Sequence, residues 1–359
     1  MKGKRNSNIE LLRIIAMLTI VTGHLISQGG VIENCFSKII SMYAGSAARI
    51  SVNIFLFIGV YFMVDSNFKA ERILDLWGEL FLYTLCFTGV SLLFEHSIPI
   101  KNLIKAILPF STRALWFASA YLILVCLHPF LKNVFLLSKK QFIFLICILT
   151  FVMCIMPTFS EKQSDFIVNV AWFIYVYILI GGLKKYTKFF AERKYILQKY
   201  GIVIALLIYF VLSSCRVVAF LYNNKYTMIL CDFGEQYLSD IKSIPNVLCA
   251  LSVFSDVVTK RPSESKIVNK VARSTFAVYI IHQTPAFFTV LWSKIIHTEL
   301  WFSSDVPKFV LFITISVFCI FLFCSFIDAF RIKLIEPLYK KNRIYCFVAN
   351  KVNNILKDV

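Results

Sequence analysis

The stretch that decides the fold is residues 9–28, which read IELLRIIAMLTIVTGHLISQ. A helix needs about 20 mostly apolar residues to cross the hydrocarbon core of a bilayer, and this stretch meets that requirement. Basic residues precede it, as they do in a signal peptide, but no cleavage site of the small-x-small type follows. We therefore expect a retained first transmembrane helix rather than a cleaved leader.

The rest of the chain repeats this pattern. Of its 359 residues, 58% are hydrophobic and only 16% are charged, whereas a soluble domain keeps about a quarter of its residues charged. Lipid must therefore be the solvent for much of the surface, and we predict an all-α polytopic membrane helix bundle with about ten transmembrane helices. The predicted segments are 9–28, 46–65, 72–95, 114–131, 141–158, 166–183, 200–222, 243–258, 268–292 and 306–330.

Loop charges predict the orientation of this bundle. The net charge is +18, and lysine and arginine are concentrated in alternate loops, which places both termini in the cytoplasm. We divide the chain into a membrane-embedded domain at 1–336 and a basic cytoplasmic tail at 337–359, expected to form a short helix on the anionic inner leaflet. No basic stretch carries a nucleic-acid module, so no nucleic acid is expected as a partner. The eleven cysteines contain no CxxC pair that would indicate a metal site.

The first predicted helix carries Glu10, Arg13 and His24. Ionisable side chains inside a span are functional candidates because each costs about 3 kcal/mol or more to place in lipid. Arg13 and His24 are eleven residues apart, which puts them on one helix face about 16 Å apart, and Glu10 is close enough to pair with Arg13. Two plainer interpretations stay open: Arg13 snorkels to the inner headgroups, or His24 lies at the outer interface. His128 falls near a predicted loop, and we expect it to be solvated.

These residues resemble the opening of the integral-membrane acyltransferase 3 family, the O-acetyltransferases of bacterial surface polysaccharides. The signature of that family is an arginine, ten residues and then a histidine, as in Arg13 to His24. Three later stretches resemble further motifs of the family in the same order, so the resemblance covers nearly the whole chain. They are Ser51-Val52-Asn53-Ile54-Phe55 through Tyr61-Phe62-Met63, Leu115-Trp116-Phe117-Ala118-Ser119-Ala120-Tyr121-Leu122 with Pro129, and Thr275-Phe276-Ala277-Val278-Tyr279-Ile280-Ile281-His282-Gln283.

Two positions depart from the family pattern. The second helix of the family usually carries Ser-Gly-Tyr, where this chain has Gly59-Val60-Tyr61, so a small polar side chain is missing. The family often has an Arg-x-x-Arg pair on the inner side of the third helix, and here the pair is Lys69-x-x-Arg72. Lysine keeps the charge but cannot bind a phosphate with two parallel hydrogen bonds. These departures concern the sub-type and its activity more than the family.

The resemblance implies transfer of an acyl group, expected to be acetyl, from cytoplasmic acyl-CoA to a hydroxyl of a cell-surface polysaccharide or lipid-linked sugar at a bacterial plasma membrane. Acetyl-CoA is then a substrate, and neither a resident cofactor nor a metal is expected. Arg13, with Lys69 and Arg72, would bind the CoA phosphates from the inner side. His24 would be the catalytic base or an acylated nucleophile, and Glu10 would orient Arg13.

Five further side chains are weaker candidates for binding the acceptor. Tyr279 and His282 share a helix face, and they either bind the acceptor, supply a second acid/base group or make a hydrogen bond between helices. Asn53 leaves the same choice. Trp116 and Tyr121 could stack on a sugar, although an aromatic belt at the membrane interface is the plainer interpretation for Trp116.

Two other functional classes stay open. A secondary transporter or flippase for a glycan precursor would also contain buried histidine and glutamate side chains as proton relays. Such transporters show repeated halves with broken helices, and we find no matching pair of halves in this sequence. The third class is a non-catalytic membrane subunit of a glycan assembly enzyme, which the missing serine slightly favours.

Overall fold

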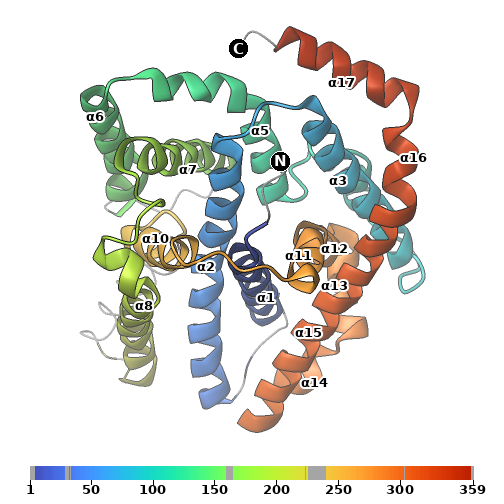
Figure 1. Cartoon of the computed structure of the whole chain (residues 1–359). Helices are drawn as coiled ribbons and strands as arrows, with labels where there is room; N and C mark the ends of the chain where they lie inside the picture. The colour runs from blue at the N-terminus through green and yellow to red at the C-terminus, as the bar shows by residue number, and fades with distance from the viewer. Residues whose placement is uncertain are drawn as a thin grey trace.

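The computed structural model describes residues 5–28, 32, 34–158, 165–222, 224, 240–302 and 304–356 (Figure 1). All regular secondary structure in these ranges is helical, so the predicted all-α class is confirmed. Seven helices of the described part are long and apolar enough to cross a membrane, as expected of a multi-pass membrane protein. They are α1 (Ser7–Gln28), α2 (Cys35–Val64), α3 (Ala70–Ser91), α5 (Trp116–Leu131), α7 (Phe166–Thr187), α8 (Ile196–Tyr222) and α15 (Val306–Phe330).

The remaining predicted segments form shorter helices, so a total of ten spans stays a prediction. α10 (Ile244–Val258) has 15 residues, and α6 (Lys139–Thr150) passes into a π-helical turn at Phe151–Ile155. The other short helices are α4 (Ile100–Ile107), α11 (Lys266–Val271), α14 (Thr298–Phe302), α16 (Glu336–Lys340) and α17 (Arg343–Ile355).

The single helix predicted over 268–292 is wrong, because the chain breaks within it. α12 (Thr275–Gln283) ends before Thr284, and α13 (Pro285–Thr289) starts directly after it. Thr284 is not helical, with φ −57° and ψ 122°. The ring of a proline disfavours the helical conformation for the residue before it, which explains the position of the break.

The centre of the bundle is α1, which packs against α2, α10, α12 and α15 (Figure 1). The approach of α1 to α2 is tight at Gly23, where a Cβ atom would lie 2.3 Å from the Cβ of Ala48. Only glycine fits there without a shift of the two helices, because protein interiors leave no spare volume at such a contact. The glycine therefore sets the position of the neighbouring His24 relative to α2.

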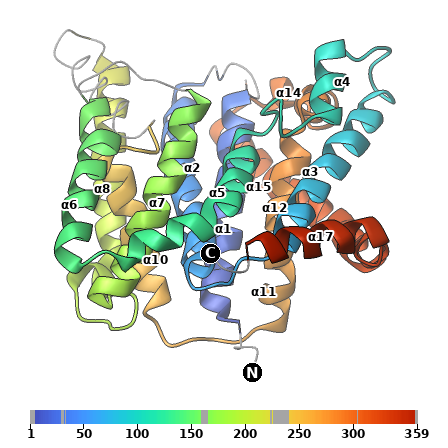
Figure 2. The ribbon, with the colours of Figure 1, turned by 90° about the horizontal axis from the view of Figure 1, so that it is seen from above.

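The predicted helix in the tail is α17, which lies across the bundle whereas α1 runs up through it (Figure 2). α17 supplies hydrogen bonds that the start of α3 lacks by itself. The backbone N–H of Ala70 donates to Oδ1 of Asn353 at 2.8 Å, and Nδ2 of Asn353 donates to the carboxylate of Glu71 at 3.1 Å. Asn353 thus caps α3 from a distant part of the chain.

Candidate active site

The inner part of the site starts from the ion pair predicted on the first helix. Glu10 is buried, and its carboxylate lies 3.1 Å from the guanidinium of Arg13, which confirms the pairing. Arg13 lines a cavity of 320 Å³ together with Lys69 and Arg72 from the start of α3. The three cations predicted to face CoA therefore meet on one cavity.

A hydrogen-bonded group holds Arg72 in this cavity. Its Nη1 donates to Oγ of Ser66 at 2.6 Å, and the backbone oxygen of Ser66 accepts from Nε2 of His128 at 3.1 Å. Because Nε2 carries the proton, Nδ1 of His128 accepts from the hydroxyl of Tyr177 at 2.8 Å. His128 is 1% exposed, so the expectation that it is solvated was wrong: α5 continues past Pro129 and buries it.

A second cavity of 210 Å³ adjoins the first, and Arg13, Gly59 and Tyr121 line both. A Cβ atom on Gly59 would lie 3.0 Å from the hydroxyl oxygen of Tyr121. The tyrosine hydroxyl therefore lies beside the position where the family pattern has a serine. The structure places Tyr121 with the predicted CoA cations, and not in the cavity that contains His24.

The outer part of the site is a pair of histidines that are distant in sequence. Nδ1 of His24 lies 2.8 Å from Nε2 of His282, and Nδ1 of His282 lies 2.5 Å from the backbone oxygen of Val278. Only a protonated nitrogen can donate to that oxygen, so Nε2 of a neutral His282 carries no proton. It therefore accepts a hydrogen bond from Nδ1–H of His24. Nε2 of His24 then keeps its lone pair, which both a base and a nucleophile require.

His24 lines a cavity of 590 Å³ together with Trp116 and Gln283. Two arginines that the sequence analysis passed over also line it, Arg49 on α2 and Arg216 on α8. Both lie inside predicted spans, and the rule that selected Arg13 would have found them, since an ionisable side chain in a span needs a reason. The prediction of orientation used only lysine and arginine residues in loops, so it did not consider Arg49 and Arg216.

A layer of aromatic side chains separates the outer cavity from the inner ones. On α2, Val52 lines the His24 cavity, and Phe55, about one turn later, lines the cavity of 210 Å³. On α5, Trp116 lines the His24 cavity, and the next residue, Phe117, lines the cavity of 210 Å³. The ring of Phe117 lies 5.8 Å from that of Phe55 and 5.8 Å from that of Tyr279.

Asn53 is used in a different way from the other predicted site residues. It is completely buried, its Nδ2 donates to the backbone oxygen of Ile241 at 2.6 Å, and its Oδ1 accepts from Nε1 of Trp172 at 3.2 Å. One end of the amide thus joins α2 to α7 and the other joins α2 to the turn before α10, which agrees with the structural one of the two interpretations left open. Tyr279 lies between the two regions, with its ring 6.3 Å from that of His282.

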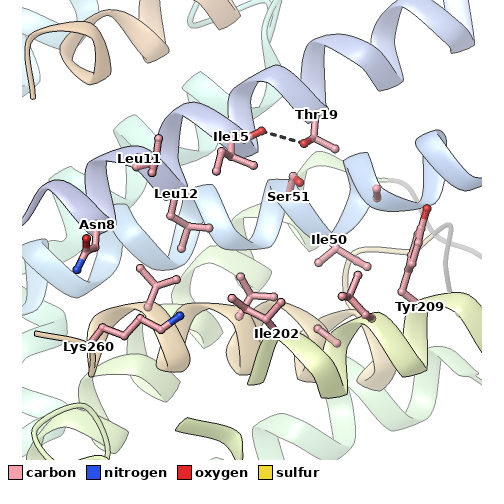
Figure 3. A pocket seen from close by; sticks show the side chains of 15 residues that line it. Asn8, Leu11, Leu12, Ile15, Thr19, Ile50, Ser51, Ile202, Tyr209 and Lys260 are labelled. Carbon is pink, nitrogen blue, oxygen red and sulfur yellow. Dashed lines mark hydrogen bonds between the residues drawn. The ribbon is translucent and has the colours of Figure 1, made fainter. Parts of the chain in front are cut away.

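A fourth cavity of 480 Å³ lies between α1, α2, α8 and α10 (Figure 3). Its walls are mostly apolar, with exposed Leu11 and Ile15 on one side and Ile202 on the other. Lys260 lines one end, and its Nζ lies 3.2 Å from the carboxylate of Asp256. These residues of α1 are on the helix face opposite to that of Arg13 and His24, so the groove is separate from the candidate site.

A comparison with protein families agrees with this arrangement. A family model described as an acyltransferase domain, acyltransferase 3, matches residues 6–327. A search of curated proteins and of solved structures found no match. The family match spans both histidines and nearly all of the helical bundle. The chain therefore belongs to the acyltransferase 3 family of membrane acyltransferases.

Proposed function

We propose that the chain is a membrane O-acyltransferase that moves an acetyl group from cytoplasmic acyl-CoA to a hydroxyl of a cell-surface polysaccharide or of its lipid-linked precursor. The proposal includes a bacterial plasma membrane and ten spans with both termini in the cytoplasm. In this orientation the Arg13 cavity opens from the inner side and the His24 cavity lies toward the outer side. The family match and the membrane-spanning helices support acyl transfer by a multi-pass protein.

The observation that carries the proposal is the tautomer of His24, whose Nε2 makes no hydrogen bond with the described residues. The hydrogen bonds from His24 to His282 and from His282 to Val278 fix the tautomers of both rings. A base whose other nitrogen is held by a hydrogen bond keeps its orientation and its protonation state between turnovers. His24 also lines a cavity large enough for a sugar residue, and Trp116 on its wall offers a flat apolar surface of the kind on which sugars stack.

The reaction uses each group once. Nε2 of His24 takes the proton of the acceptor hydroxyl while the hydroxyl oxygen bonds to the thioester carbon. The C–S bond breaks, and the sulfur of CoA leaves as a thiol after it receives the proton from the His24 imidazolium. A positioned base of this kind contributes about 10²- to 10⁴-fold in rate. In the alternative order, Nε2 attacks the thioester carbon first, the C–S bond breaks and CoA leaves as a thiolate. The hydroxyl oxygen then takes the acyl group from the imidazole, and the proton of the hydroxyl goes to the thiolate.

The inner cavity serves the donor. CoA carries several phosphates, and Arg13, Lys69 and Arg72 present three cations to bind them. Glu10 keeps Arg13 in place through their ion pair. From there the flexible pantetheine arm reaches the aromatic layer that separates donor from acceptor.

The test is acyl transfer by purified protein in lipid vesicles, with labelled acetyl-CoA and the extracted surface glycan. We expect label on the glycan with the unaltered chain and no measurable transfer with His24→Ala. His96→Ala makes the same change at an exposed histidine that lines none of the four cavities, and it should keep full activity.

Each other outcome has a distinct meaning. Undiminished transfer by His24→Ala would refute the assignment of the base. Glycan that crosses the vesicle membrane without gaining label would indicate a flippase instead. Label that stays on the protein when the glycan is omitted, and is absent in His24→Ala, would select the nucleophilic order of steps.

A further inference from the structure

The wall of the His24 cavity carries a positive charge that the reaction does not use. Arg49 lies on α2 and lines this cavity, and it makes no hydrogen bond or ion pair with the residues that the structure describes. It shares this lining with His24. Arg216 lines the same cavity and donates from Nη1 to Oγ of Ser46 at 2.9 Å, one turn before Arg49.

The polarity of this wall is one-sided. Serine, glutamine and tryptophan side chains accompany the two arginines, and no aspartate or glutamate is among the described residues that line the cavity. One of its amides, Gln283, has a buried Nε2 with no hydrogen-bond partner in the described part of the chain. An arginine in a span is costly unless it meets an anion or water, so this wall is suited to bind a negatively charged group.

That anion does not belong to the donor. The CoA phosphates have their own cations at Arg13, Lys69 and Arg72, and the aromatic layer around Phe117 separates that cavity from Arg49. A charged group at Arg49 must therefore be part of the molecule that enters the His24 cavity from the outer side. Under the proposed function, this molecule is the acceptor.

We propose that the acceptor sugar carries an oxyanion, and that Arg49 binds this group while His24 takes the proton from the hydroxyl. That the bound molecule is the acceptor rests on the proposed function, whereas the residues of the site are those that line the cavity. The planar fork of arginine matches a carboxylate or a phosphate with two parallel hydrogen bonds. Fixing the sugar at its charged group leaves its hydroxyls free to approach Nε2 of His24.

A binding measurement tests the site without any catalysis. Equilibrium dialysis of the full chain in lipid nanodiscs would compare labelled glucuronate, glucose 1-phosphate and glucose. We expect the two anions to bind and Arg49→Gln to weaken them about tenfold to a hundredfold, the range for a hydrogen bond between charged groups. Arg49→Lys should fall between the two, because it keeps the charge without the fork. Tighter binding of one anion than the other identifies the oxyanion as a carboxylate or a phosphate.

The matched control is Arg113→Gln, the same change at an arginine that lies over the ring of Phe166 and lines none of the four cavities. It should bind all three sugars as the unaltered chain does. Glucose bound as tightly as the anions, or anion binding unaffected by Arg49→Gln, would overturn the inference.

A transfer assay separates this inference from the proposed function. The extracted glycan is compared with the same glycan after chemical reduction of its carboxyl groups, and after removal of its phosphates. We expect one of these treatments to lower kcat/KM about tenfold or more with the unaltered chain, and to have little further effect with Arg49→Gln. Equal transfer to all three glycans would overturn the inference and leave the enzyme in place. Transfer to none would overturn the proposed function, and the dialysis result would still decide whether Arg49 binds an oxyanion.

Discussion

The inner and outer cavities both meet α1, and they use it differently. At the inner cavity Arg13 is one of three cations, and two of them are held separately: Arg13 by Glu10, and Arg72 by Ser66. At the outer cavity His24 is held by a chain of hydrogen bonds through His282 to a backbone oxygen. Under the proposed function, donor binding is therefore distributed over charges that can be removed one at a time. The chemical step then depends on a single tautomer of His24.

This contrast predicts its largest effect at His282. Replacing His282 by phenylalanine removes the acceptor for Nδ1–H of His24 and keeps a ring of similar size. We expect kcat to fall about 100-fold with an unchanged KM for acyl-CoA, because His24 loses its orientation and its fixed proton. Steady-state kinetics measure both constants. His282→Gln, whose side-chain oxygen can accept, should recover part of kcat, and a rise in KM in place of the fall in kcat would break the comparison.

A smaller effect is expected where α1 touches α2. Gly23→Ala adds a methyl group 2.3 Å from the Cβ of Ala48, and overpacking of this kind destabilises a protein by about 1–3 kcal/mol. Thermal unfolding in detergent should show the loss, and the double variant Gly23→Ala, Ala48→Gly should restore stability. Gly78→Ala is the control, because a Cβ there meets nothing within 4 Å. Equal melting temperatures for the two single variants would contradict the tight contact.

Loss of a cation from the inner cavity should change the KM for acyl-CoA and leave kcat unchanged. Arg72→Gln removes one of three cations, so we expect the KM for acyl-CoA to rise about tenfold with little change in kcat. The rise should shrink at high salt, because exposed charges are screened. Lys140→Gln, an exposed lysine outside the cavities, should leave KM unchanged. A fall in kcat at unchanged KM would instead place Arg72 in the chemical step.

The smallest effect is expected at the cap that α17 places on α3. Asn353→Ala removes the acceptor for the N–H of Ala70, and the loss of such a cap costs about 1 kcal/mol. We expect the KM for acyl-CoA to rise only a few-fold, because α3 carries Arg72 two residues after Ala70. Burial and a hydrogen bond to Asp75 raise the pKa of Tyr345, so this second contact of α17 stays intact across neutral pH. The effect of Asn353→Ala should therefore be the same at pH 6 and pH 8.

The sequence predicts the parts of the site that depend on helical spacing. The ion pair of Glu10 with Arg13 follows from a separation of three residues, and the shared face of Arg13 and His24 from a separation of eleven. The contact of His24 with His282 links residues 258 positions apart, and no local pattern encodes such a pairing. Its discovery needed the packing of α12 on α1.

Two errors have physical causes that the sequence already contained. Pro285 indicates the break after α12, because the residue before a proline avoids the helical conformation. The opposite happened at His128, where the neighbouring Pro129 does not end the helix and the side chain is buried. Proline is thus a signal whose outcome depends on whether neighbouring helices can satisfy the freed backbone groups.

The aromatic layer around Phe117 also matters for the energy supply of a cell. A continuous water path between the two faces of an energised membrane would let protons run down the gradient that drives ATP synthesis. The rings of Phe55 and Tyr279 each lie 5.8 Å from that of Phe117, which leaves little room for such a path. Under the proposed function only an uncharged thioester arm passes between these rings, so delivery of the acyl group does not require a water-filled channel.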